Sequence, residues 1–135
     1  MKVFSTTFPV RYYETDQMGI VHHSNYIRFF ENARSQMMVD LGCPIEQFEK
    51  QFGVLIPIVS VECRYRRPAR MGDVLTATAS VVKEPQAKME VAQTVVNQNG
   101  EVCAEGLVVL GFIDSKSFRP VRCPEAIIKM FEQLQ

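Results

Sequence analysis

The sequence predicts a single α+β domain in which an antiparallel β-sheet wraps around one long helix. Two observations carry this prediction. The 135 residues fall within the usual size range of one domain. Along the chain, the hydrophobic pattern changes from a strand to a long helical stripe and then to a run of strands. We therefore expect one domain over residues 1–135, with the helix packed inside the curved sheet.

Composition excludes several classes of function. The chain is 47% hydrophobic and 22% charged, which is typical of a globular protein with an ordinary core. Fifteen basic and fifteen acidic side chains cancel, so we expect no nucleic-acid or anionic membrane partner. The cysteines are widely spaced and lack a zinc-binding pattern, which predicts reduced structural thiols. They are Cys43, Cys63, Cys103 and Cys123.

The first ten residues contain no long apolar stretch. This segment therefore resembles neither a signal peptide nor a membrane-spanning helix. We expect a cytoplasmic protein.

The first two elements are a strand and the long helix. Residues 2–13 are rich in Val, Phe, Thr and Tyr, which predicts a strand, and a polar loop follows it. Apolar residues then recur at helical spacing over residues 25–41, where Ser24 or Asn25 is placed to cap the helix start. Gly42, followed by a proline at position 44, predicts the helix end. Between the apolar positions, Glu31 with Arg28 and Arg34 predicts a charged surface cluster.

The rest of the chain predicts further strands between two short helices. In residues 59–66, Val59, Val61, Cys63 and Tyr65 alternate with polar residues, which predicts a strand with one face in the core. The Asn97–Gly100 segment favours a tight turn between two antiparallel strands. The expected helices cover residues 44–52 and 124–134, and the remaining expected strands cover 74–83, 88–96 and 101–112.

Asp16 is the first candidate for chemistry. It lies in a loop with Gly19, a few residues before the predicted start of the long helix. The first N–H groups of a helix have no intrahelical partner, so they can polarise a carbonyl group that a nearby carboxylate attacks or hydrates. Gly19 permits unusual backbone torsions or close approach of a ligand. The same pattern is also typical of an aspartate that only satisfies backbone groups in a turn.

Three segments carry a resemblance to a known family. Residues 11–26, with the order D-x-x-G-x-V from Asp16 to Val21, resemble the signature of the 4-hydroxybenzoyl-CoA thioesterase family and its bacterial acyl-CoA thioesterase branch. Residues 30–34 and 65–73 resemble further parts of the same family. The resemblance implies a hotdog fold and hydrolysis of an acyl-CoA to a free acid and coenzyme A, without metal or cofactor.

The resemblance also implies roles for single residues. Asp16 takes the position of the nucleophile or general base, and the His23 N–H that of the group polarising the thioester carbonyl. The His23 side chain matches a histidine that assists catalysis, and Tyr12 matches a tyrosine that lines the site. For substrate binding, we expect contributions from five further residues. These are Gly19, Val21, Asn25, Arg66 and Arg67.

Several alternatives accompany this hypothesis. Asp16, His22 and His23 contain metal-binding groups, but adjacent residues point in different directions and the chain has no third histidine. A hotdog dehydratase would need an acidic residue about fourteen positions after His23, where this chain has Met37. Against a phosphate role for the arginines of this stretch, alternation places Arg64 and Arg66 on an outer, solvated sheet face.

A non-catalytic module that binds acyl-CoA or acyl carrier protein remains an alternative on the same scaffold. The resemblance further implies a homodimer or homotetramer with sites at the subunit interface. An unpaired sheet edge would otherwise be exposed.

Overall fold

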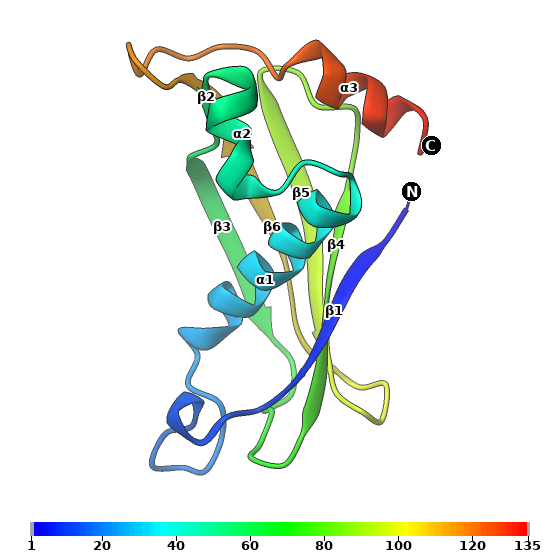
Figure 1. The fold of residues 1–135 in the computed structure, drawn as a ribbon. Coiled ribbons are helices and arrows are strands. Elements are labelled where there is room, and N and C mark those ends of the chain that lie inside the picture. The colour runs from blue at the N-terminus through cyan, green and yellow to red at the C-terminus, as the bar shows by residue number, and fades with distance from the viewer. Residues whose placement is uncertain (1, 135) are drawn as a thin grey trace.

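The computed structural model describes residues 2–134 and shows an α+β fold (Figure 1). A five-stranded antiparallel sheet, in the order β1-β4-β5-β6-β3, curves around helix α1. A small second sheet pairs β2 with β7. The elements are β1 (Phe4–Pro9), α1 (Asn25–Asp40), α2 (Ile45–Phe52), β2 (Val54–Leu55), β3 (Ile58–Tyr65), β4 (Val74–Val81), β5 (Lys88–Val96), β6 (Val102–Gly111), β7 (Ile113–Asp114) and α3 (Glu125–Glu132).

Helix α1 forms the core with the inner face of the sheet. It packs against β1, β4 and β5, and its buried side chains include Phe29, Phe30 and Met37. The rings of Phe8 and Phe29 lie 4.9 Å apart, which fixes β1 against the helix. Apolar residues on one stripe of a helix bury well against a sheet, so the observed core confirms the predicted helical periodicity. No helix within residues 2–134 has the length and apolarity needed to cross a membrane.

The predicted element types hold, while several boundaries were wrong. The first strand ends at Pro9, and residues 12–14 form a 3₁₀ turn instead of continuing it. Pro9 still pairs with Val74, and the Val10 N–H donates to the Asp73 carbonyl at 2.9 Å before the chain turns away from β4. The short sheet of β2 and β7 was not predicted, because two-residue strands carry no periodic signal. The hairpin of β5 and β6 forms as predicted around the Asn97–Gly100 turn.

The predicted helix cap is also corrected. Neither Ser24 nor Asn25 accepts a hydrogen bond from the free N–H groups of α1 through its side chain. The Ser24 hydroxyl is bonded to Nδ1 of His22 at 2.8 Å, and the amide of Asn25 donates to the carbonyl of Glu14. The start of α1 therefore lacks a side-chain cap of its own.

Strand β3 departs most from its prediction. It is an edge strand, and both of its faces are largely exposed, with Val61 and Tyr65 at 36% and 50% of their accessible surface. A β-bulge between Ile58 and Ser60 also interrupts the expected alternation at Val59. The predicted core face of this strand is thus uncovered within the chain. An apolar edge of this length is a ready template for another strand.

Gly106 is required for the pairing of β3 with β6. A Cβ atom at this position would lie 1.9 Å from the carbonyl oxygen of Glu62, whereas one at Gly111 would meet Val59 Cγ2 at 3.4 Å. We expect Gly106→Ala to lower the free energy of unfolding by about 3 kcal/mol, because a backbone oxygen cannot move without separating the two strands. Gly111→Ala serves as the control and should change it by less than about 1 kcal/mol. Urea unfolding curves of the two variants measure this difference, and equal stabilities would contradict it.

Candidate active site

The loop before α1 is fastened to the helix start through Glu14. The carbonyl oxygen of Glu14 accepts hydrogen bonds from the His22 N–H and from the Asn25 side-chain amide, both at 2.8 Å. Its carboxylate accepts the Arg11 N–H at 2.7 Å. Glu14 and Asn25 are both buried, so these bonds are shielded from competing water. The positions of residues 15–21 are therefore set by backbone bonds.

The far side of the loop is tied to the turn between β3 and β4. The Val21 N–H donates to the carbonyl of Ala69 at 2.8 Å, and the Ala69 N–H donates in turn to the Tyr26 hydroxyl at 3.1 Å. Ile20 forms an isolated bridge with Arg70. Because Tyr26 belongs to α1, the loop, the turn and the helix start are connected into one unit.

Asp16 is half-buried and directly precedes the exposed tip of this unit, residues 17–19. Its carboxylate oxygen Oδ1 accepts the Met18 N–H at 2.8 Å, and its backbone pairs with Ile20 and Gly19 across the loop. Gly19 has a φ of +75°, a conformation that side chains disfavour. This turn fixes the direction of the carboxylate while its second oxygen, Oδ2, makes no hydrogen bond within residues 2–134.

The backbone N–H of His23 is free. Its neighbours on either side are engaged, since His22 donates to Glu14 and Ser24 donates to the His22 ring. In the described part of the chain, the His23 N–H has no hydrogen-bond acceptor. An unpaired N–H at the positive end of a sixteen-residue helix attracts an oxygen that carries negative charge.

Aromatic rings surround this amide. The exposed ring of His23 stacks on the ring of His22 with 4.2 Å between centroids. It meets the Tyr65 ring in an edge-to-face arrangement with 6.4 Å between centroids. The Tyr65 hydroxyl donates to the His23 carbonyl at 3.0 Å. Burial raises the pKa of Tyr26 and of Tyr65, so both phenols stay protonated. Tyr65 thus orients the His23 peptide from the edge strand.

A pocket of about 310 Å³ opens between the Asp16 loop and the end of β3. It brings together five of the residues predicted for the site. These are Asp16, Val21, His23, Arg66 and Arg67. Its other lining residues were not predicted as part of a site: Met18, Ile20, Tyr26, Tyr65 and Pro68. Tyr26 and Tyr65 had been predicted as core residues from their spacing, which does not distinguish a core residue from one that lines a pocket.

Three predicted site residues lie outside this pocket. Tyr12 is 81% exposed, and within residues 2–134 its backbone carbonyl makes the local contacts, to Thr15. Gly19 shapes the turn that presents Asp16, and Asn25 is buried behind the loop on Glu14. Asn25 and Gly19 therefore position the loop in this structure. The role of Tyr12 in lining the site stays a prediction.

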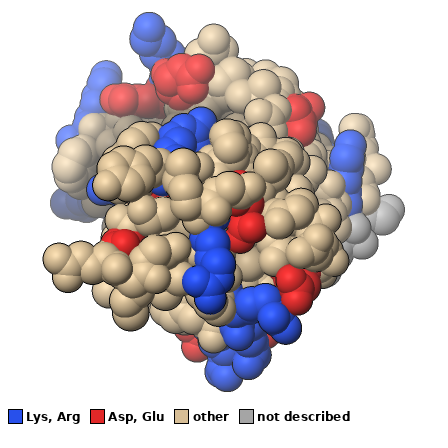
Figure 2. All heavy atoms as spheres, turned by 90° about the horizontal axis from the view of Figure 1, so that it is seen from below, with Lys and Arg blue, Asp and Glu red and all other residues tan. Residues whose placement is uncertain are grey.

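Two basic residues of the turn after β3 are paired with acids. Arg66 forms an ion pair with Glu105 at 2.6 Å, and Arg67 forms one with Glu101 at 3.1 Å. Seen from this end of the molecule, basic and acidic side chains alternate and form no uniform basic field (Figure 2). Arg67 also lines a neighbouring polar hollow. The other residues of that hollow are Pro68, Arg70, Asp73, Asn97, Asn99 and Glu101.

The prediction of a charged surface cluster on α1 was wrong for Arg34. Arg34 is only 7% exposed and donates from Nη1 to Oε1 of Gln93 at 2.9 Å. Glu31 remains exposed, and no ion pair joins it to Arg34 within residues 2–134. The position 34 side chain turns from the helix flank toward the sheet, which helical spacing alone does not show. No group of three metal-binding side chains occurs between residues 2 and 134.

Comparisons with known proteins place this geometry in a family. The model of the thioesterase-like superfamily matches residues 10–131. The chain belongs to this superfamily. A protein of Bacillus subtilis strain 168, provisionally described as an acyl-CoA thioesterase, is 32% identical over 126 residues, covering 93% of this chain and 91% of the relative. The acyl-CoA thioester hydrolase YbgC of Escherichia coli O157:H7 is 28% identical over 132 residues, with 93% and 95% covered.

A solved structure agrees with the sequence relatives. A DHNA-CoA thioesterase from Staphylococcus aureus superposes with a TM-score of 0.92 at 26% identity, over 100% of this chain and 92% of the other. Membership of the thioesterase-like superfamily confirms the predicted family, the hotdog fold and the assignment as a thioesterase-type enzyme. In this superfamily member, the pocket with Asp16 and the free His23 amide is the candidate active site.

Asn25 provides a test of how the loop is held. Asn25→Asp keeps the size of the side chain but replaces the N–H donor with an oxygen that faces the Glu14 carbonyl. We expect a loss of about 2 kcal/mol in the free energy of unfolding, even though an acid is otherwise favoured at a helix start. Asn32→Asp, at an exposed position of the same helix, is the control. Thermal or urea unfolding measures the effect, and a variant as stable as its control would contradict it.

Proposed function

We propose that this protein hydrolyses an acyl-CoA to a free acid and coenzyme A in the pocket between the Asp16 loop and β3. One observation carries the proposal: the same cavity is lined by Asp16, whose Oδ2 is free within residues 2–134, and by His23, whose N–H just before α1 has no acceptor in that part of the chain. A thioester carbonyl needs both groups, one to deliver the attacking oxygen and one to hold the oxyanion. The names of the Bacillus and Escherichia relatives support the same substrate class.

In the proposed reaction, the thioester carbonyl oxygen accepts a hydrogen bond from the His23 N–H. In one route, Asp16 takes a proton from water as the water oxygen attacks the carbonyl carbon. In the other route, the Asp16 carboxylate itself attacks the carbon and forms an anhydride, which water then hydrolyses. The C–S bond breaks, and the thiolate of coenzyme A receives a proton. Either route consumes one water and releases one acid and one thiol.

The His23 ring is a further group of the pocket that can assist this step. It is exposed, lines the pocket and is held by stacking on His22. In its protonated form it can donate a proton to the leaving thiolate. His22 is held differently, because its Nδ1 is bonded to the Ser24 hydroxyl and N–H. We therefore assign the assisting role to His23 and a positioning role to His22.

Replacing Asp16 tests this assignment. Asp16→Asn retains a side-chain oxygen for the Met18 N–H but cannot act as base or nucleophile, so we expect at least about a 100-fold loss of kcat with an unchanged fold. The control is Asp40→Asn, at an exposed carboxylate near the end of α1 whose main contact is Gln36. Thiol release from an acyl-CoA, followed with a chromogenic disulfide, measures both. Asp16→Asn with near wild-type turnover would falsify the role of Asp16.

The coenzyme A moiety has a path out of the pocket past Arg67. This residue lines both the candidate active site and the polar hollow beside it, where Arg70 and two asparagine side chains are also present. A guanidinium binds phosphate oxygens through two parallel N–H groups. We assign Arg67 to a phosphate of coenzyme A, for which its present partner Glu101 must give way. Arg66 contributes to the same wall of the pocket.

Two substrates separate this role from a structural one. With an acyl-CoA, Arg67→Gln should raise KM several-fold, because one exposed charge-assisted contact to phosphate is lost. With the same acyl group on N-acetylcysteamine, which lacks the phosphates, the kinetics should not change. Arg28→Gln, at an exposed position of α1 outside both pockets, is the matched control. Steady-state kinetics on the two thioesters decide, and equal effects on both would refute the phosphate contact.

We further propose that the enzyme works as a homo-oligomer built on β3. Two edge strands related by a two-fold axis across the sheet pair antiparallel. Centred pairing of β3 places Ile58 of one subunit opposite Tyr65 of the partner subunit. The exposed apolar residues of β3 become buried, which removes the open edge.

A further inference from the structure

Arg34 is a buried cation without a counter-charge in contact. Arg34 is 7% exposed, and its one side-chain hydrogen bond within residues 2–134 runs from Nη1 to Gln93 Oε1. No carboxylate lies within 4.0 Å of the guanidinium in that part of the chain. Burial lowers the pKa of Arg34, and the nearby Glu31 partly offsets the effect. A guanidinium stays charged in proteins, so this position places a permanent charge inside the fold.

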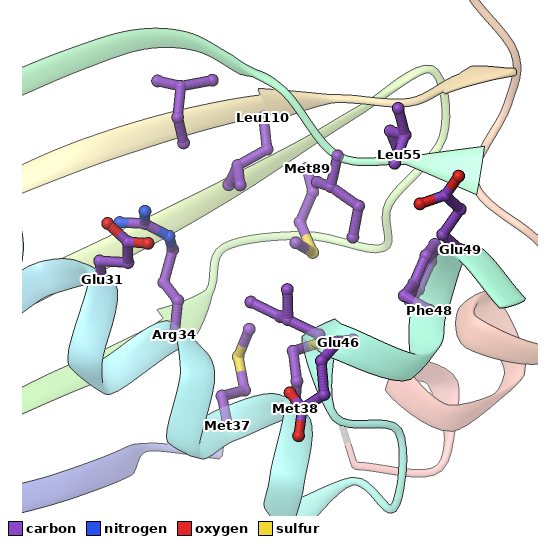
Figure 3. Close-up of a pocket in the computed structure, with 13 residues that line it drawn as sticks. Glu31, Arg34, Met37, Met38, Glu46, Phe48, Glu49, Leu55, Met89 and Leu110 are labelled. Carbon is purple, nitrogen blue, oxygen red and sulfur yellow. The ribbon is translucent and has the colours of Figure 1, made fainter. Parts of the chain in front are cut away.

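Arg34 lies at the edge of a cavity. It lines a second pocket of about 310 Å³ between α1, α2 and the inner face of the sheet (Figure 3). Met37, Met38, Phe48 and Met89 form its apolar interior. No fully buried side-chain nitrogen of residues 2–134 lacks a partner, so the nitrogens of Arg34 that make no hydrogen bond keep accessible surface beside this pocket. The exposed carboxylates of Glu31, Glu46 and Glu49 lie around the cavity.

This second pocket belongs beside the reaction in the paired enzyme. Ile58, at the first residue of β3, lines the Arg34 pocket, and Tyr65, at the last residue, lines the Asp16 pocket. Antiparallel pairing of two β3 strands therefore joins the Arg34 pocket of one subunit to the Asp16 pocket of the other, because neighbouring strands lie only about 5 Å apart. The thioester then sits at Asp16 of one subunit while the acyl tail extends toward Arg34 of its partner.

We propose that Arg34 is a specificity-determining residue that selects acyl tails carrying an oxygen acceptor, either a hydroxyl or a carboxylate, near their far end. The inference rests on the proposed function and adds the class of acyl group. An apolar tail would occupy the methionine-lined space but would displace water from the Arg34 N–H donors without offering them an acceptor, which disfavours its binding. An oxygen at the tail end accepts those donors. The pocket is at the small end of ligand cavities, so the tail is a short chain or a single ring.

Arg34 also belongs to a structural network. Gln93, which accepts from Arg34, donates from Nε2 to the carbonyls of Phe30 at 2.7 Å and Thr78 at 3.3 Å. Through these bonds, Gln93 ties α1 to β4 and β5 whether or not Arg34 is present. A purely structural arginine would change stability and affect all substrates equally. A specificity residue instead changes the ratio between matched substrates, so this ratio is the decisive readout.

Two substrate pairs test the proposal by kinetics. The first is phenylacetyl-CoA with 4-hydroxyphenylacetyl-CoA, and the second is hexanoyl-CoA with adipoyl-CoA, which differs by a terminal carboxylate. We expect wild-type enzyme to favour the oxygenated member of at least one pair by about tenfold in kcat/KM. The pair that responds identifies hydroxyl or carboxylate as the acceptor. Arg34→Met should bring this ratio close to one, whereas Met38→Leu, in the apolar wall of the same pocket, should preserve it.

The proposal is overturned if neither pair favours the oxygenated member, or if Arg34→Met keeps the wild-type ratio. Arg34→Lys retains the charge with fewer donors and should give an intermediate ratio, so it decides the matter if the methionine variant does not fold. Calorimetric binding of the same four thioesters to Asp16→Asn, with and without Arg34→Met, gives a test that needs no turnover. If the wild-type enzyme hydrolyses none of the four thioesters, that result counts against the proposed function alone. Equal affinities for both members of each pair would contradict the role of Arg34.

Discussion

The carbonyl oxygen of Glu14 holds the candidate active site together. It accepts one hydrogen bond from the His22 backbone and one from the Asn25 side chain. These two bonds hold the loop against the start of the helix. The N–H groups of His22 and Ser24 are engaged, whereas the His23 N–H between them has no acceptor within residues 2–134. The Asp16 turn presents its carboxylate to the same pocket. A preorganised donor of this kind needs no rearrangement when negative charge develops.

The edge strand β3 links this local arrangement to the whole molecule. Its last residue, Tyr65, orients the His23 peptide, and its first residue, Ile58, borders the cavity that contains Arg34. The strand is apolar on a face that nothing in residues 2–134 covers. In the proposed dimer, the same strand therefore completes the sheet and connects the reaction site of one subunit with the tail cavity of the other.

Sequence patterns predicted the order of the main elements and pointed to Asp16, which lines the candidate active site and whose role stays a prediction. The helical stripe from Tyr26 onward and the Asn97–Gly100 turn carry strong local signals, so both were placed correctly. Asp16 became a candidate because a loop acid, a glycine and a helix start occur within a few residues, and the resemblance of residues 11–26 to the family signature favoured it over a simple turn aspartate. The role of Tyr65, the exposure of β3 and the burial of Arg34 depend on contacts between distant segments and on which face is covered. Periodicity reports that a residue faces inward but cannot distinguish core from pocket.

The central claim is that the free His23 N–H polarises the thioester carbonyl beside Asp16. The vibrational frequency of that carbonyl tests the claim most directly, because a hydrogen bond to oxygen weakens the C=O bond. Isotope-edited infrared difference spectra of a ¹³C-labelled acyl-CoA bound to Asp16→Asn would report it without turnover. The account predicts a lower carbonyl frequency in the complex than for the same thioester in water. A frequency equal to or above the value in water would contradict it.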